Sequence, residues 1–536
     1  MNAEHKGLGT RSRSAVWASL DQTWDVVVVG GGITGAAVAR EAARLGLRTL
    51  LVEQRDFAWG SSSRSSKLVH GGLRYLKEGK IGLTRDAVRE RKRLLEEGPG
   101  LVDPLGFLLA TYDGDHPGRL VYRLGLSLYD VLALQWRHTF HDPGEFRFLA
   151  PHIKVAGLRG GFRFLDARTD DARLVLRVIE EAVRCGATAL NYAAAVDLLR
   201  SEGRVAGVHV RDVETGRTIE VRARAVVNAT GAWADELRDR VGGESLIRPL
   251  RGSHLVVPAW RLPAPQAVTF LHPQDRRPIF VFPWEGVTIV GTTDVDHEAP
   301  LNDEPTISEA EAAYLIEGVR SSFPTLDLGP ADVTATFAGV RPVVGSGKAD
   351  PSEESRDHLI LNDQGMITVT GGKLTTFRLI ARDVINVLHT TFPNVPPAGS
   401  DAPALDPTEP LVSKELDGDA ARIEAWYTSS ADALLRAARP EELAPIAGTP
   451  LLWAELRWAA RSEAVVHLDD LLLRRVRIGL LLSGGGVDQL PRVRTVVQAE
   501  LGWDDQRWEQ EAERYADLWR RTHRLPDLSA PVARAS

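Results

Sequence analysis

Residues 25–53 read DVVVVGGGITGAAVAREAARLGLRTLLVE, and this stretch decides the fold of the N-terminal part of the chain. Asp25 to Val29 is a short β-branched run closed by glycines, which predicts a buried strand. Gly35 to Leu45 is rich in helix-forming Ala, Arg and Glu, and Gly46 ends that helix before a second apolar strand, Leu47 to Val52. Strand, glycine-rich turn, helix and strand form a βαβ unit, which predicts an α/β fold.

The glycines between strand and helix have the spacing of a dinucleotide-binding loop. Gly30, Gly32 and Gly35 form G-x-G-x-x-G, whose backbone N–H groups can approach a pyrophosphate at the helix N-terminus. Glu53 follows the second strand, where a carboxylate can accept hydrogen bonds from a ribose 2′-hydroxyl and disfavours the 2′-phosphate of NADP. A turn that only packs a helix on a sheet is the structural alternative.

The loop alone does not distinguish FAD from NAD, because both carry the same ADP half. Two later segments decide the question. Asn228 to Gly231 (NATG) ends a β-run, and Gly371 to Thr376 (GGKLTT) follows the strand-like MITVT and precedes a helix. A cofactor that extends across a sheet can use several strand ends, whereas a one-domain NAD unit does not need them. We therefore expect FAD.

Length and composition limit the possible classes of protein. A chain of 536 residues predicts two or three domains, and a formal net charge of -7 argues against nucleic acid as a partner. No uncharged apolar run approaches the length of about 18 residues that a membrane-spanning helix requires. The single Cys185 excludes an internal disulfide and a Cys-based zinc site, so we expect no metal and a cytoplasmic location. Residues 1–20 lack the apolar core of a secretory signal and are expected to be a flexible extension.

Other elements follow from apolar spacing and turn residues. Helices are expected over Thr84 to Glu97 with Thr84 as the N-cap, over Arg119 to Trp136, and over Asp170 to Cys185. Strand-like segments surround Ala187 to Tyr192, Val205 to Val210 and Ala225 to Val227. Alternating runs between Ala267 and Val295 predict an antiparallel sheet that covers a ligand cavity.

The C-terminal part differs in pattern from the rest. Phe392 to Pro410 is dense in Pro, Ser and Ala and is interpreted as a linker. Ala454 to Ser462 and Leu468 to Leu482 have helical apolar spacing with charges on another face, which predicts a separate helical domain. The expected divisions are an FAD-binding domain at 21–78, 166–252 and 345–391, a substrate domain at 79–165 and 253–344, a linker at 392–410, and a helical domain at 411–525.

Gly60 to Leu76 (GSSSRSSKLVHGGLRYL) resembles the segment after the βαβ unit in FAD-dependent glycerol-3-phosphate dehydrogenases of the bacterial aerobic, respiratory type. The likeness continues through Thr169–Leu176, Asn228–Trp233, Arg251–Pro258, Ile289–Val295, Gly339–Pro342 and Gly371–Thr376. Ser61 and Ala232 replace the commoner Thr and Pro of the family, and no calcium-binding loop of the mitochondrial relatives is present. The resemblance implies a Rossmann-like FAD-binding domain of the glutathione-reductase and D-amino-acid-oxidase type, an antiparallel-sheet substrate domain and a helical C-terminal domain.

The resemblance also implies an activity and its partners. Hydride would pass from C2 of sn-glycerol 3-phosphate to flavin N5, giving dihydroxyacetone phosphate, and the electrons would pass to a membrane quinone. This implies peripheral contact with the inner face of the cell membrane, and a homodimer is a further expectation. The segment Arg119 to Trp136 has the composition of an interfacial helix, although a buried packing helix has the same pattern.

The matching motifs supply candidate site residues. Arg341, Arg74 and Lys373 would hold the phosphate, unless the arginines form salt bridges at a domain boundary or Lys373 serves flavin N1. His254 is the expected general base, although a lone histidine beside a strand can be structural, and Asp294 would orient the base or a substrate hydroxyl. Besides Lys373, the residues expected to bind the cofactor are Gly30, Gly32, Ile33, Thr34, Gly35, Glu53, Ser62, Ser63, Lys67, Leu68, His70, Gly71, Gly72, Thr230, Gly231, Gly372, Leu374 and Thr375.

Three alternatives to this function remain. A soluble oxidase of the same substrate would hand its electrons to oxygen, and an amine or 2-hydroxy-acid oxidoreductase could use the same fold. A flavin-dependent sensor would need the dinucleotide loop but no substrate-binding cations.

Overall fold

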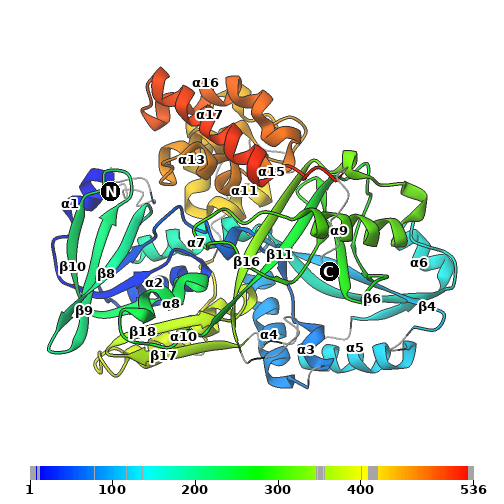
Figure 1. The fold of residues 1–536 in the computed structure, drawn as a ribbon, viewed down its shortest axis with the longest axis horizontal. Helices are drawn as coiled ribbons and strands as arrows, with labels where there is room; N and C mark the ends of the chain where they lie inside the picture. Colours follow the sequence, from blue (N-terminus) through cyan, green and yellow to red (C-terminus); the bar gives the residue numbers. More distant parts are fainter. Residues whose placement is uncertain are drawn as a thin grey trace.

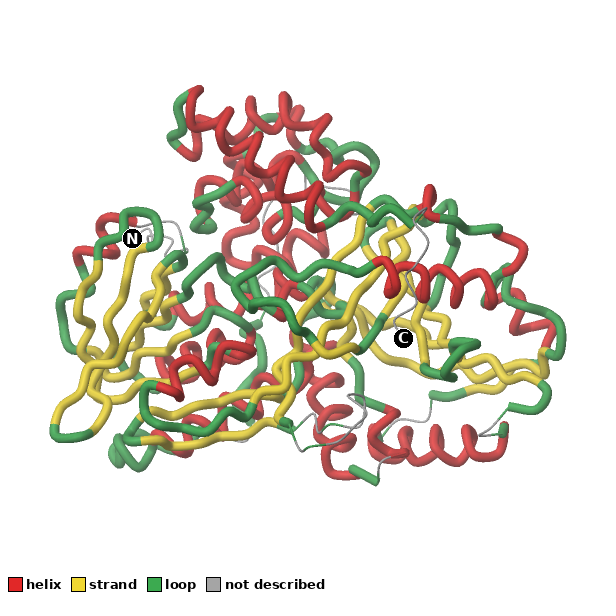
Figure 2. The backbone as a smooth tube through the Cα atoms, viewed as in Figure 1, coloured by secondary structure: helices red, strands yellow, loops and turns green. Residues whose placement is uncertain are grey.

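The computed structural model describes residues 8, 13–77, 79–115, 118–134, 137–345, 347, 354, 357–399, 401–407 and 420–528. Two β-sheets lie side by side, and the C-terminal helices lie above their junction (Figure 1). Figure 2 shows the same division, with strands concentrated in two regions and the helical group at the top of the view.

The first sheet has the order β17-β18-β10-β1-β2-β7, and its strands from β18 to β7 pair in parallel. Strand β17 pairs antiparallel with β18, and β8 and β9 continue β10 as an antiparallel ribbon. This topology confirms the α/β class. The strands are β1 (Trp24–Val29), β2 (Thr49–Val52), β7 (Thr188–Leu190), β8 (Ala193–Ser201), β9 (Arg204–Asp212), β10 (Thr218–Asn228), β17 (His358–Asp363) and β18 (Met366–Gly371).

The central strand is buried on both faces, as its unbroken valine run predicts. Val26 and Val28 pack in the core that contains helices α2 (Ile33–Arg44), α7 (Asp171–Arg184) and α10 (Phe377–Leu388). Val27 and Val29 pack on the opposite side with the β8–β10 ribbon. Alternate side chains of one strand therefore fix a layer on each face of the sheet.

The second sheet has the order β15-β11-β14-β13-β12-β4-β6-β3, with β16 paired to β11 and β5 to β6. Its pairs are antiparallel as expected, except that β4 and β12 run parallel. The strands are β3 (Leu68–Val69), β4 (Val102–Tyr112), β5 (Thr139–His141), β6 (Leu158–Thr169), β11 (Ile247–Pro258), β12 (Ala267–Leu271), β13 (Pro278–Trp284), β14 (Val287–Gly291), β15 (Val295–Asp296) and β16 (Ala335–Val344).

Helices flank this second sheet. Helices α6 (Pro143–Leu149) and α9 (Glu309–Ser322) pack with it in one apolar core, whereas α3 (Leu73–Lys77), α4 (Ile81–Glu97) and α5 (Arg119–Ala133) lie below it in Figure 1. The remaining helices are α1 (Arg13–Ala18) and α8 (Ala234–Asp239) beside the first sheet, and α11 (Ala420–Tyr427), α12 (Ala431–Ala437), α13 (Trp453–Ser462), α14 (Leu468–Asp470), α15 (Ile478–Leu481), α16 (Leu490–Leu501) and α17 (Asp505–Thr522). In the described part of the chain, none of the helices is long and apolar enough to cross a membrane.

Several local expectations are wrong. Part of the expected flexible extension is ordered, because α1 buries Trp17 and the Arg13 guanidinium pairs with Asp212 at 2.8 Å. Helix α4 begins at Ile81, so Thr84 lies inside the helix and donates its hydroxyl to the Lys80 carbonyl instead of capping.

The expected linker is attached to the first domain where it is described. Ala404 and Leu405 are buried, and the Ala404 N–H donates to the Glu97 carboxylate at 2.6 Å. Asp406 pairs with Arg40 of α2 at 2.8 Å. Residues 401–407 therefore pack as a strap over α2 and α4, while 408–410 lie outside the described residues.

The expected single helix from Leu468 to Leu482 is also wrong. The chain forms α14, a π-helical turn over Leu471–Arg475, and α15, with Arg477 in the left-handed region at φ 53°. Its charged side chains do not form a solvent-facing stripe, because Asp469, Asp470, Arg474, Arg475 and Arg477 are all buried. Arg474, Arg475 and Arg477 each have a partner in the first domain, which the local sequence pattern cannot reveal.

Candidate active site

A cavity of about 2010 Å³ runs between the two sheets. One end lies at the carboxyl ends of β1, β2 and β10, and the other is enclosed by β4, β6, β12, β13 and α5. In a doubly wound sheet this edge is where ligands bind. Residues of both sheets line the cavity, and its volume is large enough to hold an extended dinucleotide together with a small substrate.

The glycine-rich loop forms the first end of the cavity. Gly30 adopts φ +112°, and a Cβ on Gly35 would lie 1.9 Å from the Gly30 carbonyl oxygen, so both positions require glycine. The N-terminus of α2 follows directly and has no acidic residue in its first turn. Backbone N–H groups and the helix dipole therefore provide a donor set that suits a pyrophosphate.

Glu53 lines the same end of the cavity. Its carboxylate accepts hydrogen bonds from the backbone N–H groups of Gly31 at 2.7 Å and Arg55 at 2.9 Å. Burial raises its pKa above the ordinary value, against the effect of those two hydrogen bonds. Glu53 thus holds the glycine-rich loop and lines the cavity beside it.

Most of the residues expected to bind the cofactor line the cavity. They are Gly30, Gly32, Ile33, Thr34, Glu53, Ser62, Leu68, His70, Gly72, Thr230, Gly231, Gly372, Lys373, Leu374 and Thr375.

Four of them do not line it. Gly35 lies behind Gly30, and the Gly71 N–H donates to the Tyr129 hydroxyl at 3.0 Å and to Asp166 at 3.1 Å. Ser63 and Lys67 lie beneath the wall. The Lys67 ammonium, which is 0% exposed, donates to Asp171 at 3.0 Å and to the Ser63 carbonyl at 3.2 Å. Burial and the charge of Arg477 lower the pKa of Lys67 to about 8.

Two arginines meet at the second end of the cavity. Asp294 lies between them, with its carboxylate 2.7 Å from the Arg341 guanidinium and 2.7 Å from that of Arg277. Arg341, from β16, also donates to the Thr292 hydroxyl at 3.0 Å. All of these side chains line the cavity, so the carboxylate holds two cationic forks side by side at its wall.

Sequence reasoning missed Arg277. It directly precedes the strand-like run PIFVF, which was expected to cover the cavity, so a cation at the start of that strand was the available signal. Its pairing with Asp294 was not visible, because the two residues are brought together only by the turn from β14 toward β15.

Lys373 lies on another side of the site. Lys373 lines the cavity between β18 and α10, and its ammonium is 3.7 Å from the centroid of the Tyr75 ring. Arg74 belongs to α3, but its side chain lies outside the described residues.

The two candidate histidines occupy different positions. His70 lines the cavity, and its backbone carbonyl accepts a hydrogen bond from Thr375 at 3.3 Å. His254 is 1% exposed and lies behind the wall, stacked on Phe337 with ring centroids 4.5 Å apart. Its Nε2 is 2.8 Å from the hydroxyl of Ser66, which does line the cavity. Burial, then Arg341 and Lys67, hold the pKa of His254 well below its ordinary value.

Among the described residues, no group of three or more His, Cys, Asp or Glu side chains is arranged to hold a metal ion. The cavity wall presents backbone amides, hydroxyls, carboxylates, arginines, lysines and imidazole.

Comparisons with known proteins agree with this geometry. A family model described as FAD dependent oxidoreductase matches residues 25–378, and one described as the C-terminal domain of alpha-glycerophosphate oxidase matches residues 415–508. A protein of Staphylococcus haemolyticus named aerobic glycerol-3-phosphate dehydrogenase is 35% identical over 87% of this chain and 89% of its own length. Glycerol-3-phosphate dehydrogenase 2 of Mycobacterium tuberculosis is 36% identical over 92% of this chain and 88% of its own.

A solved structure extends the likeness to the whole fold. The glycerol-3-phosphate dehydrogenase of Bacillus halodurans, solved in complex with FAD, superimposes with a TM-score of 0.79 at 27% identity and covers 98% of this chain and 100% of its own. The fold and the cavity thus define an FAD-dependent oxidoreductase, which confirms the expected cofactor. Within that class, the chain belongs to the aerobic glycerol-3-phosphate dehydrogenase family.

Proposed function

We propose that this chain oxidises sn-glycerol 3-phosphate to dihydroxyacetone phosphate. The names of its relatives support this substrate, and one feature of the cavity carries the proposal: the paired guanidinium groups of Arg277 and Arg341, held by Asp294. Two arginine forks at adjacent positions suit a phosphate dianion better than a single carboxylate, because each fork can donate two parallel hydrogen bonds. FAD, when bound, supplies the two-electron acceptor.

The protein's part in the reaction begins with this clamp. With the phosphate at Arg277 and Arg341, the C2 hydroxyl is free to lie toward the wall formed by Ser66 and His70. Fixing both ends of a three-carbon substrate converts a collision into an oriented encounter. Lys373 adds a further positive charge to the cavity, where it can attract the dianion or stabilise reduced flavin.

We propose that the hydroxyl proton passes to His254 through the Ser66 hydroxyl. The 2.8 Å contact between Ser66 and His254 Nε2 supports this route, and the low pKa keeps the imidazole neutral and able to accept a proton. Because Arg341 contributes to lowering that pKa, a dianion bound at Arg341 would offset the effect and make His254 more basic when substrate is present. His70 is the alternative base on the cavity wall.

We propose a membrane quinone as the final acceptor, with peripheral contact at the inner face of the cell membrane. Helix α5 supports this, because its large apolar side chains Leu120, Val121, Leu124, Leu128 and Val131 are exposed. Val121, Leu124 and Leu128 also line the cavity, so its second end reaches that exposed helix. An apolar face with flanking Arg119 and Arg123 is typical of a helix that lies in a bilayer interface. A homodimer, which we propose from the family resemblance, would be tested by sedimentation.

Steady-state turnover with alternative acceptors tests the proposal. We expect the FAD-loaded protein to reduce a soluble quinone analogue with glycerol 3-phosphate and to form little peroxide in air. Stoichiometric peroxide would favour the oxidase. Turnover with amines or 2-hydroxy acids but not with glycerol 3-phosphate would favour an amine or 2-hydroxy-acid oxidoreductase.

A further inference from the structure

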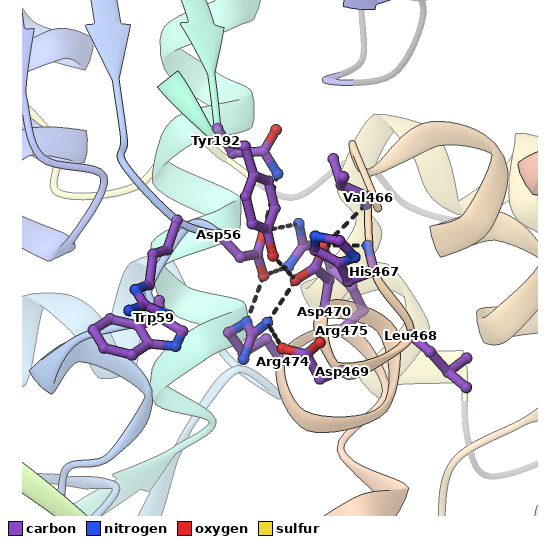
Figure 3. Close-up of polar contacts among 12 residues, drawn as sticks. Asp56, Trp59, Tyr192, Val466, His467, Leu468, Asp469, Asp470, Arg474 and Arg475 are labelled. Carbon is purple, nitrogen blue, oxygen red and sulfur yellow. Dashed lines mark hydrogen bonds and ion pairs between the residues drawn. The ribbon is translucent and has the colours of Figure 1, made fainter. Parts of the chain in front are cut away.

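The C-terminal domain places three arginines beneath the wall of the FAD cavity. Arg474 and Arg475 come from the π-helical turn, Arg477 precedes α15, and none is more than 2% exposed. Figure 3 shows Arg474 and Arg475 directed toward Asp56 of the first domain. All three reach one stretch of the first domain, residues 56–66, which we call the cavity segment.

The first anchor is at Asp56, the start of the cavity segment. The Arg475 guanidinium forms a two-pronged pair with it, each N–O distance being 2.7 Å, and Arg474 Nε lies 2.5 Å from the same carboxylate. Arg474 is itself held by Asp469 at 2.7 Å and Asp470 at 2.6 Å (Figure 3). Burial opposes ionisation of Asp56, but Arg475 and Arg474 outweigh it and lower its pKa.

The second anchor is near the end of the cavity segment. Arg477 Nη1 pairs with Asp171 at 2.9 Å, and its Nη2 donates to the Ser63 carbonyl at 2.9 Å. Asp171 in turn accepts from the Ser65 N–H at 3.0 Å and the Ser65 hydroxyl at 2.8 Å. Arg477 therefore holds two residues of the cavity segment, one directly and one through Asp171.

Side chains of the cavity segment form part of the cavity wall. Trp59, Ser61, Ser62, Arg64 and Ser66 all line the cavity. The Ser62 hydroxyl accepts from the Ile33 N–H at the start of α2 at 3.0 Å, so the cavity segment also touches the glycine-rich loop. Through the cavity segment, the C-terminal arginines thus support both the glycine-rich loop and the neighbouring wall of the cavity.

We propose that Arg474, Arg475 and Arg477 are positioning residues that fix the cavity segment in its FAD-binding conformation, making the C-terminal domain part of the cofactor site. Removing charges from water is costly, so buried ion pairs add little to stability compared with apolar packing. An arginine that forms two hydrogen bonds does, however, fix the relative orientation of the groups it joins. Both anchors come from one short stretch of the C-terminal domain, residues 474–477, which makes the order of the cavity segment depend on the docked domain. The inference rests on FAD binding and is independent of the substrate.

The test compares two charge-conserving variants of the full-length protein. Arg477→Lys keeps a positive charge opposite Asp171 but gives up the second arm to the Ser63 carbonyl. Arg457→Lys is the control, because Arg457 is also a buried arginine of the same domain, 5% exposed against 1% for Arg477. Its ion-pair partners among the described residues, Glu442 and Glu500 at 2.5 Å each, lie within that domain. The readouts are the dissociation constant for FAD, measured well below the melting temperature, and hydrogen exchange of the peptide covering residues 56–66 in the FAD-loaded protein.

We expect Arg477→Lys to raise the FAD dissociation constant about tenfold, because a charge-assisted hydrogen bond contributes about 1.5 kcal/mol and about 1.4 kcal/mol is a factor of ten. Exchange in the cavity segment should also become faster, while Arg457→Lys should change neither readout even if it melts earlier. Wild-type affinity and exchange in Arg477→Lys would overturn the proposal. So would equal losses in both variants, since that would indicate a general effect of stability.

A milder variant covers the case in which Arg477→Lys does not fold. Ser65→Ala removes the hydroxyl bond to Asp171 and the acceptor of the Lys67 N–H, but it keeps every charged side chain of the cluster. We expect it to weaken FAD binding and to speed exchange of the cavity segment in the same direction. Unchanged FAD affinity and exchange in that variant would contradict the proposal.

Discussion

Asp294 keeps Arg277 and Arg341 side by side although both carry positive charge, because its two carboxylate oxygens each accept one of them. A lysine at either position would keep the charge but lose the fork. We therefore expect Arg277→Lys and Arg341→Lys each to raise KM for glycerol 3-phosphate by about ten- to hundredfold, which corresponds to about 1.5–3 kcal/mol of charge-assisted hydrogen bonding. The measurement is steady-state kinetics with saturating acceptor.

Arg248→Lys is the matched control for the phosphate clamp. Arg248 pairs with Asp296 at 2.7 Å in the same sheet but does not line the cavity. The KM of Arg248→Lys for glycerol 3-phosphate should therefore stay at the wild-type value. If both clamp variants also keep that value, the phosphate is bound elsewhere.

The role of His254 as general base can also be tested by changing a single residue. We expect His254→Gln to lower kcat about a hundredfold or more with little change in KM, because a general base contributes about 10²–10⁴ in rate. In the wild-type protein, the acidic limb of kcat should lie at a higher pH than that of kcat/KM, since bound dianion offsets the effect of Arg341 on the pKa of His254. Pre-steady-state flavin reduction, measured against substrate concentration from well below the ordinary histidine pKa of about 6.5 up to about pH 9, gives both acidic limbs.

His70→Gln is the comparison variant for the base. A larger loss of kcat in His70→Gln than in His254→Gln would move the base to the cavity wall. Full kcat in His254→Gln at every pH would place it elsewhere.

At the scale of elements, the β1–α2 turn carries the cofactor. Gly35→Ala would place a Cβ 1.9 Å from the Gly30 carbonyl oxygen, so α2 must move away from the turn. We expect FAD affinity to fall more than about tenfold, since overpacking a tight contact costs about 1–3 kcal/mol. Isothermal titration of the FAD-free protein with FAD measures it.

Gly82→Ala in α4 provides the control for that change. A Cβ there has nothing within 4 Å, and alanine is favoured over glycine in a helix by about 0.5–1 kcal/mol. FAD binding should be unchanged and the melting temperature the same or higher. Wild-type FAD affinity in Gly35→Ala would show that the loop tolerates a side chain.

Elements differ in how far the sequence predicts them. The βαβ unit follows from local signals, because the valine run, the glycines and the alanine-rich helix each act within a few residues. The interruption of the expected helix after Leu468 could not be predicted, because Arg474 pairs with Asp56, which is 418 residues away in the sequence. His254 was chosen by its chemistry and motif, but whether its ring faces the cavity depends on how β11 packs against Phe337.

At the scale of the whole molecule, His467 joins the C-terminal domain to the β9–β10 turn. Burial alone would lower its pKa, but hydrogen bonds to Glu214 at 3.1 Å and Glu511 at 2.9 Å raise the pKa to about 9. Because the folded pKa is raised, this stabilisation is present below the unfolded value of about 6.5 and is lost as pH rises through about 9. We expect His467→Gln to remove about 1–3 kcal/mol of unfolding free energy at the acidic end of that window and little above it.

Urea unfolding at both ends of this pH window measures the contribution of His467. A variant that lost equal stability at both ends would show that the imidazole contributes by packing rather than by charge.

The function of the protein depends on which substrate reduces the bound flavin. The most direct measurement is the absorbance of the FAD-loaded protein during anaerobic addition of glycerol 3-phosphate, followed by a quinone. We expect the flavin absorbance to be lost in stoichiometric proportion and to return when the quinone is added. A flavin that stays oxidised with glycerol 3-phosphate but is reduced by an amine or a 2-hydroxy acid would contradict the account.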